Sequence, residues 1–150
     1  MRIMTLNTAK VKNIDLLYPK LSYQIQGAAI DVRKHYGPGH KEVLYQRVFA
    51  EELSFRKVKF EKEKPFKIYS NLTSKVIASY QPDFIVDNKI IVEIKALNII
   101  PRKLINQLYD YLRNSNYELG YFINFSGHKL YMKRIIYSNI NKSRFKNESK

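Results

Sequence analysis

The sequence has no cysteine and only three histidines, and these shortages exclude several classes of chemistry. Without cysteine there is no disulfide, no thiolate nucleophile and no cysteine-ligated zinc or iron–sulfur centre. The three histidines, His35, His40 and His128, are too scattered to build a histidine-rich metal site. A metal in this protein would therefore be a hard cation held by oxygen, such as Mg²⁺ or Mn²⁺.

Long apolar runs are also missing. The first ten residues lack the apolar core of a signal peptide, and no stretch of the sequence approaches the length of a membrane span. A chain of 150 residues is long enough to fold as one domain around a hydrophobic core. We therefore expect a soluble cytoplasmic domain without a membrane partner. The sequence leaves the oligomeric state open, and a homodimer is compatible with it.

Acidic residues are scarce, and the resulting charge indicates a partner. Thirteen acidic residues face 27 basic ones, which gives a net charge of +14. The segment 138–150 carries four basic residues against one acid, a net +3, so the remaining chain still carries +11. An excess of this size favours a polyanion, and nucleic acid is the common one. The alternatives are a solvated basic surface and, more weakly, an anionic membrane surface.

Hydrophobic periodicity predicts the elements. Helical spacing indicates helices at about 21–35, 40–56 and 101–113, with Gly37-Pro38-Gly39 ending the first. Strands are expected over 58–69 with an interruption at Pro65, and over 76–80, 84–86, 90–95, 119–125 and 130–137. This order predicts an α/β fold, a mixed central sheet of about five strands flanked by helices. We expect an N-terminal arm at 1–18, one domain at 19–137, and a basic disordered tail at 138–150.

A predicted β-hairpin dominates the centre of the chain. The apolar runs Phe84–Val86 and Ile90–Val92 flank the polar residues Asp87–Lys89. If these three residues form the loop, Asp83 lies directly opposite Glu93, and alternation along the strand adds Lys95 to the same face. A two-residue loop would instead separate the two acids onto opposite faces. Because facing like charges are destabilising, the pair suggests a cation between them.

A third acid, Glu42, opens the second predicted helix on the same side as the apolar stripe that contains Tyr45 and Phe49. It has two interpretations of about equal weight from spacing alone. One is a favourable contact with the positive end of the helix dipole. The other is a functional role, in which Glu42 points at the Asp83–Glu93 patch.

Together these residues resemble a known family. Pro82-Asp83 followed by Glu93-x-Lys95 is similar to the motif of the PD-(D/E)xK nuclease superfamily. Gly39-x-x-Glu42-x-x-Tyr45 resembles the signature of its GxxExxY family. Further similar segments follow in order around Gln107 and in 120–125, so the resemblance covers about 21–137.

The resemblance implies a restriction-endonuclease-like α/β/α core and a metal-dependent nuclease that cuts nucleic acid, DNA in preference to RNA. Asp83 and Glu93 would bind Mg²⁺ or Mn²⁺, with Glu42 as a third acid, direct or through water. Lys95 would hold or polarise the attacking water and stabilise developing charge. Gln107 would be a supporting residue carried on the third helix.

Other interpretations remain open at this stage. Asp83 can simply cap a turn after Pro82, and Glu93 with Lys95 can be an ordinary solvated ion pair. Gln107 taken alone suits an interior amide, and Tyr45 and Tyr111 suit core aromatics with bonded hydroxyls. At the level of function, the alternatives are a catalytically inactive nucleic-acid-binding module with the nuclease fold and, more weakly, a protein-interaction partner in a larger nucleic-acid assembly.

Overall fold

A computed structural model describes residues 17–142. Most of the predicted N-terminal arm and residues 143–150 of the predicted tail therefore lie outside the described residues. Within this range, no helix is long and apolar enough to cross a membrane. The elements are α2 (Pro19–Tyr36), α3 (Glu42–Phe55), β1 (Phe60–Lys62), β2 (Phe66–Tyr69), β3 (Val76–Tyr80), β4 (Phe84–Val86), β5 (Ile90–Lys95), α4 (Arg102–Arg113), β6 (Leu119–Asn124), β7 (Tyr131–Ile136) and the short 3₁₀ helix η1 (Asn139–Asn141).

The main sheet has five strands in the order β1-β4-β5-β6-β7. Only β5 and β6 run parallel among these neighbours, and α4 is the crossover that joins them. A parallel pair needs such a crossover because no tight turn can bring the chain back to the same end of the sheet. The mixed sheet of about five strands with flanking helices is confirmed.

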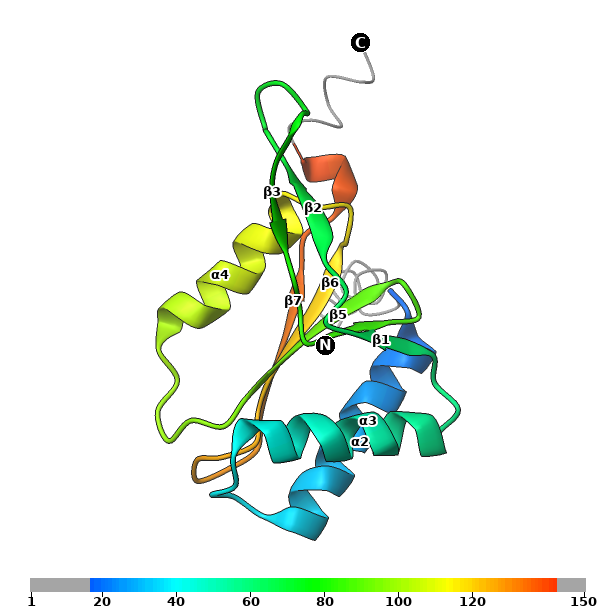
Figure 1. Cartoon of the computed structure of the whole chain (residues 1–150), viewed down its shortest axis with the longest axis vertical. Helices are drawn as coiled ribbons and strands as arrows, with labels where there is room; N and C mark the ends of the chain where they lie inside the picture. The colour runs from blue at the N-terminus through cyan, green and yellow to red at the C-terminus, as the bar shows by residue number, and fades with distance from the viewer. Residues whose placement is uncertain (1–16, 143–150) are drawn as a thin grey trace, which may run out of the picture.

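The two faces of the sheet carry different layers. The helices α2 and α3 lie on one face and α4 on the other (Figure 1). Along β5, Val92 and Ile94 pack toward the α2–α3 side with Phe49, whereas Ile91 packs toward α4 with Leu108. Side chains alternate along a strand, so Glu93, two residues after Ile91, belongs to the α4 face.

The central hairpin has the predicted register. Ile85 pairs with Ile91 and Val86 with Ile90, so the loop has three residues. Asp87 and Asn88 have φ values of 48° and 54°, and the amide of Lys89 donates to the carbonyl of Val86 at 2.9 Å. Asp and Asn tolerate the left-handed region better than most residues, which explains why they form this turn.

The interruption expected at Pro65 is confirmed, and it divides the predicted strand region 58–69 into two strands that lie in different sheets. Its first part, β1, lies at the edge of the main sheet, whereas β2 leaves that sheet and pairs only with β3. Pro65 cannot donate a ladder hydrogen bond, and Glu63 just before it has a φ of 54°, so the chain turns here. The strand at Val76–Tyr80 is confirmed, but it belongs to this separate two-stranded sheet.

The expectation of disorder from Ser138 onward is wrong for residues 138–142. The Lys142 side chain is fully buried, and its ammonium donates to the carbonyls of Ser115 at 2.8 Å and Tyr117 at 2.7 Å. The amide of Asn139 donates to a Glu118 carboxylate oxygen at 2.9 Å. Composition marked this segment as polar, but its polar groups find specific acceptors in the loop before β6.

Candidate active site

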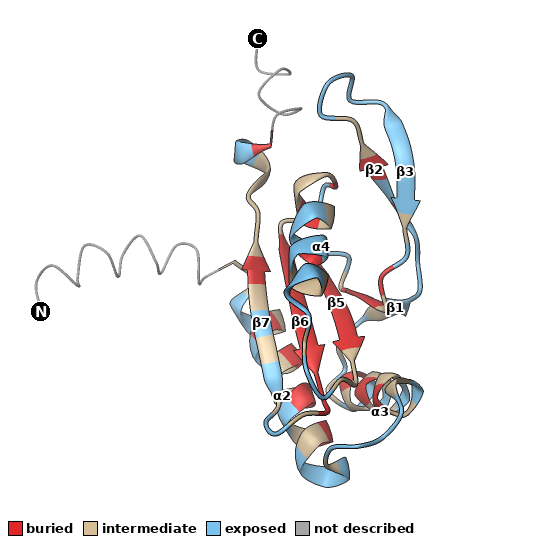
Figure 2. Cartoon of the chain, turned by 90° about the vertical axis from the view of Figure 1, so that its left-hand side faces the viewer, coloured by how far each residue is buried: buried red, intermediate tan, exposed pale blue. Residues whose placement is uncertain are grey.

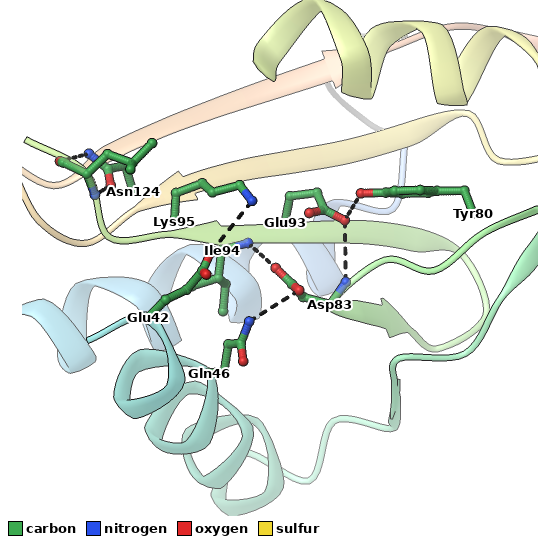
Figure 3. Close-up of polar contacts among 9 residues, drawn as sticks. Glu42, Gln46, Tyr80, Asp83, Glu93, Ile94, Lys95 and Asn124 are labelled. Atoms are coloured by element: carbon green, nitrogen blue, oxygen red, sulfur yellow. Dashed lines mark hydrogen bonds and ion pairs between the residues drawn. The ribbon is translucent and has the colours of Figure 1, made fainter. Parts of the chain in front are cut away.

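Asp83 and Glu93 lie next to each other, with Glu93 on the α4 face and Asp83 between that face and α3. Asp83 directly precedes β4, and Glu93 is the fourth residue of β5. The Asp83 amide donates to Oε1 of Glu93 at 3.4 Å, and Oδ2 of Asp83 accepts the amide of Ile94 at 2.7 Å (Figure 3). Glu93 is only 8% exposed, so this carboxylate is largely removed from water. The two acids are thus adjacent and partly desolvated.

Their titration reflects that environment. Burial, together with the charge of Asp83, raises the pKa of Glu93 to about 7. Burial also raises the pKa of Asp83, while the hydrogen bond from Ile94 acts in the opposite direction. Both acids therefore resist holding their negative charges side by side. A bound cation would remove that penalty, since opposite charge favours the ionised form.

Lys95 and Glu42 complete the polar patch. Lys95 ends β5 and Glu42 begins α3, and Nζ of Lys95 lies 3.7 Å from Oε1 of Glu42. The two side chains are 30% and 40% exposed, so the pair is open to solvent. The charge of Glu42 also contributes to the raised pKa of Asp83. Glu42 therefore acts electrostatically on the patch while it also occupies the first turn of α3, where the helix dipole favours an acid.

A pocket of about 270 Å³ opens between this patch and α4. Gln107 lies on its wall, and its side-chain amide donates to the hydroxyl of Tyr111 at 2.9 Å. A larger hollow of about 460 Å³ lies elsewhere and contains one acid, Glu118, which already accepts the amide of Asn139. The residues that line the smaller pocket are Tyr80, Gln81, Asp83, Glu93, Lys95, Leu104, Gln107, Leu108, Tyr111 and Phe122.

Four of the five predicted site residues therefore line one pocket, and Glu42 joins them through Lys95. Gln107 is an exposed residue on the pocket wall, so its interpretation as an interior amide is wrong. Tyr45 is a fully buried core aromatic whose hydroxyl donates to Gly37 at 2.7 Å, as predicted. Tyr111 has a bonded hydroxyl, but it lines the pocket and is only partly buried.

Sequence reasoning missed two residues that hold the acids in place. Nε2 of Gln46 donates to Oδ1 of Asp83 at 3.2 Å, and the hydroxyl of Tyr80 donates to Oε1 of Glu93 (Figure 3). Gln46 lies one helical turn after Glu42, so helical spacing contained a usable signal. The sequence held no such signal for Tyr80, because its strand belongs to a different sheet from that of Glu93.

The donor set fits a hard divalent cation. Among residues 17–142 no group of three or more histidines and acids is close enough to hold a metal ion. The grouping of Glu42 with Asp83 and Glu93 as a set of three ligands therefore stays a prediction. A pair of carboxylates is nevertheless sufficient for Mg²⁺, which commonly uses one or two of them and completes its shell with waters and substrate oxygens.

Comparison with known proteins places this chain in a family. No curated protein matches the chain. A solved structure described as "Crystal structure of SSO0001" shares 17% identity with a TM-score of 0.43, over 81% of this chain and 68% of that one, a similarity too weak to support a conclusion. A family model described as PD-(D/E)XK nuclease superfamily matches residues 19–135, a span that includes all five predicted site residues. Because this match covers most of the sequence, the chain belongs to the PD-(D/E)XK nuclease superfamily.

Proposed function

We propose that the protein is a metal-dependent nuclease that hydrolyses phosphodiester bonds of nucleic acid, with DNA preferred over RNA. We also propose that it belongs to the GxxExxY branch of the superfamily, on the basis of Gly39, Glu42 and Tyr45. The observation that carries the proposal is the pair of adjacent, desolvated carboxylates, Asp83 and Glu93, on one wall of a pocket that also contains Lys95.

In this proposal Asp83 and Glu93 would hold Mg²⁺ or Mn²⁺. When bound, such an ion polarises the phosphate and lowers the pKa of a coordinated water. Lys95 directs its ammonium at the pocket, where it orients the attacking water and stabilises charge that develops on the phosphate. Glu42, 3.7 Å from that ammonium, holds the ammonium in position. It would also be a third acid for the metal ion, bound directly or through a water.

The acids are held by neighbours on α3, β5 and β3. Gln46 on α3 and the amide of Ile94 on β5 each donate to one oxygen of Asp83. Tyr80 on β3 donates to Glu93. Carboxylates fixed in this way lose little conformational entropy when a ligand binds, so the site is preorganised. Gln107 faces the same pocket from α4, in a position to contact the substrate backbone.

The charge of the chain supports a nucleic-acid substrate. A net charge of +14 provides sequence-independent attraction to phosphates, which weakens steeply as salt concentration rises. We see no element of known sequence-reading type among residues 17–142, so a substrate chosen by its structure, such as a branch, flap or end, is as compatible as one chosen by sequence.

The test is a cleavage assay on DNA and RNA of several structures, with Mg²⁺ or Mn²⁺ and with chelator. We expect products from DNA that require the metal and disappear in Asp83→Asn. The matched control is Asp87→Asn, which changes an aspartate at the other end of the same hairpin. Salt-sensitive binding without cleavage of any substrate would overturn the proposal in favour of a catalytically inactive binding module.

A further inference from the structure

The hairpin formed by β2 and β3 stands out from the body of the protein (Figure 1). It is attached on one side only. There Phe66 and Ile68 pack on the α4 face of the core, and the amide of Tyr69 donates to the backbone carbonyl of Asn114 at 2.9 Å. In the part of the chain that the structure describes, β3 has no second strand partner. Residues 76–79 are exposed (Figure 2). The hairpin therefore presents a free surface.

The register of the hairpin separates this surface from the attached one. Phe66 pairs with Tyr80 and Ile68 with Ala78, so these side chains share the face toward the body. Lys67 pairs with Ser79 on the opposite face. Ile77 lies at a β-bulge, where the pairing skips from Ala78 to Val76, and its side chain is 66% exposed. The free surface of the hairpin thus carries a cation and an exposed aliphatic side chain.

Charge on the hairpin has one sign. The segment 64–80 contains Lys64, Lys67 and Lys75 and no acidic residue. Lys64 pairs with Glu61 at 2.9 Å, whereas Lys67 and Lys75 have no ion pair with any residue in the range 17–142. Two exposed, unneutralised ammonium groups on one projecting element favour an anionic partner.

The hairpin also exposes large apolar side chains. Leu72 at the tip is 88% exposed, and Ile77 and Val76 are 66% and 51% exposed. The tip is a defined turn, because the hydroxyl of Ser70 accepts the amides of Leu72 and Thr73 at 3.1 Å each. An apolar side chain presented on an ordered, basic hairpin is suited to packing against sugars or between bases.

The base of the hairpin is part of the candidate active site. Tyr80 is the last residue of β3, lines the pocket and donates its hydroxyl to Glu93. From Tyr80 to Lys75, the residue just before β3, the extended chain spans roughly 17 Å at 3.3 to 3.4 Å per residue. That length corresponds to about five base pairs of a duplex. A nucleic acid bound at the pocket can therefore extend along the hairpin.

We propose that the β2–β3 hairpin is a substrate-gripping arm for nucleic acid on one side of the scissile phosphate. Lys67 and Lys75 contact phosphates, and Leu72 and Ile77 pack against sugars and bases. This inference rests on the proposed nuclease function. A second copy of the chain is the other candidate for an unpaired strand edge, but two such hairpins would bring four unneutralised lysines together, which opposes pairing.

The test measures binding of a labelled DNA duplex by the full chain, with chelator present so that no cleavage occurs. Lys67→Ala/Lys75→Ala is compared with Lys20→Ala/Lys34→Ala, which removes two exposed lysines from α2 on the opposite face of the sheet. For the arm variant we expect the salt dependence of log K to become shallower by about 2, and Kd to rise on the order of tenfold at about 0.1 M salt. The control should retain the wild-type slope to within about half a unit.

A second variant separates the apolar contacts from the charges. We expect Leu72→Ser/Ile77→Ser to weaken binding several-fold without changing the salt slope, because it removes no charge. Thermal unfolding checks that each variant stays folded. Equal losses of DNA affinity in the Lys67→Ala/Lys75→Ala and Lys20→Ala/Lys34→Ala variants would overturn the proposal that the hairpin grips the substrate. A wild-type dimer that becomes monomeric in Leu72→Ser/Ile77→Ser would overturn it in favour of self-association.

Cleavage measured in parallel separates the two proposals. If the wild type binds and cuts DNA while the arm variant binds as well as the control variant, the proposed role of the hairpin is wrong and the nuclease function stands. If the wild type neither binds nor cuts any substrate, the proposed function falls and the arm falls with it.

Discussion

The hydroxyl of Tyr80 donates a hydrogen bond to the carboxylate of Glu93, although the two residues belong to separate sheets. The ring of Tyr80 stacks on Tyr111 of α4 with centroids 3.6 Å apart. Burial and the adjacent Glu93 raise the pKa of Tyr80, so its hydroxyl stays protonated and remains a donor. The projecting hairpin, α4 and the carboxylate pair are therefore coupled through one side chain.

Tyr80→Phe tests this coupling. The hydrogen bond from Tyr80 lowers the pKa of Glu93 against the effect of burial, so its loss should move that pKa above about 7. At pH 8 we expect the metal-free variant to lose about 1.5 to 3 kcal/mol of unfolding free energy, with a smaller loss at pH 5, where Glu93 is protonated. Urea unfolding at the two pH values measures the difference.

Tyr111→Phe is the control for that experiment. It removes the neighbouring hydroxyl but keeps the ring that stacks on Tyr80. Because the Tyr111 hydroxyl accepts from Gln107 and has no hydrogen bond to Glu93, its loss should be similar at both pH values. A Tyr80→Phe loss that does not depend on pH would show that the hydroxyl acts on stability without acting on the Glu93 charge.

The raised pKa of Glu93 predicts that the metal-free protein loses stability as pH rises. The carboxyl titrates near 7 when folded and near 4.5 when unfolded, so the folded state holds the extra proton between these values. Stability is therefore highest below about pH 4.5 with respect to this group and falls by about 3 kcal/mol in all by pH 8. Glu93→Gln should be more stable than wild type at pH 8 and similar to it near pH 4.5.

Urea unfolding across this pH range in the presence of chelator checks the prediction. The matched control is Glu51→Gln, which removes an exposed carboxylate from α3. This variant should still lose unfolding free energy as the pH rises. A Glu93→Gln protein whose stability follows the wild-type curve would contradict the raised pKa.

Asp83→Asn should abolish cleavage and leave the fold intact. An asparagine keeps one oxygen for the amide of Ile94, and the Gln46 side chain can rotate its amide to accept from the new NH₂ group. The hydrogen-bond frame therefore survives, while one negative ligand is lost. We expect a cleavage rate at least 100-fold lower, on the order of losses at essential groups, with a thermal midpoint close to that of wild type. A folded variant that cuts at the wild-type rate would remove Asp83 from the site.

Lys95→Ala is expected to have the same effect on cleavage. Its ion pair with Glu42 is open to solvent, and exposed pairs contribute on the order of 0 to 1 kcal/mol, so the fold should tolerate the change. Lys89→Ala is the control, because Lys89 pairs with Asp87 at the far end of the same hairpin. A cleavage rate unchanged by Lys95→Ala but lowered by Lys89→Ala would contradict the assigned role.

Asn124→Ala should destabilise the chain where it leaves β5. The Asn124 side chain is 2% exposed, accepts the amide of Leu97 at 2.8 Å and donates to the carbonyls of Leu97 and Ser126. Removing it leaves these partly buried backbone groups unpaired, at a cost of about 2 to 4 kcal/mol. Chemical denaturation measures the loss. Asn114→Ala, whose side chain makes one exposed hydrogen bond, is the control and should cost less than about 1 kcal/mol.

Much of the site was predictable because it depends on short-range spacing. If the loop has the three residues Asp87–Lys89, strand alternation pairs Asp83 with Glu93, and the structure has that loop and not the two-residue alternative. Gln107 could be placed on the inner side of its helix by periodicity, although its actual position is the exposed wall of a pocket. Whether Gln107 is buried or exposed depends on how α4 packs over the sheet, and residue spacing within one helix does not determine that packing.

The amino-acid sequence by itself determined the order of helices and strands, the positive charge and the central hairpin, because each follows from neighbouring residues or from composition. The structure then chose the three-residue loop, which sets Asp83 beside Glu93. Only the tertiary structure decided that β2 and β3 leave the main sheet, that Tyr80 holds Glu93, and that Lys142 is buried. These contacts join residues distant in the chain, and their partners are chosen by packing of whole elements. No local pattern records that choice.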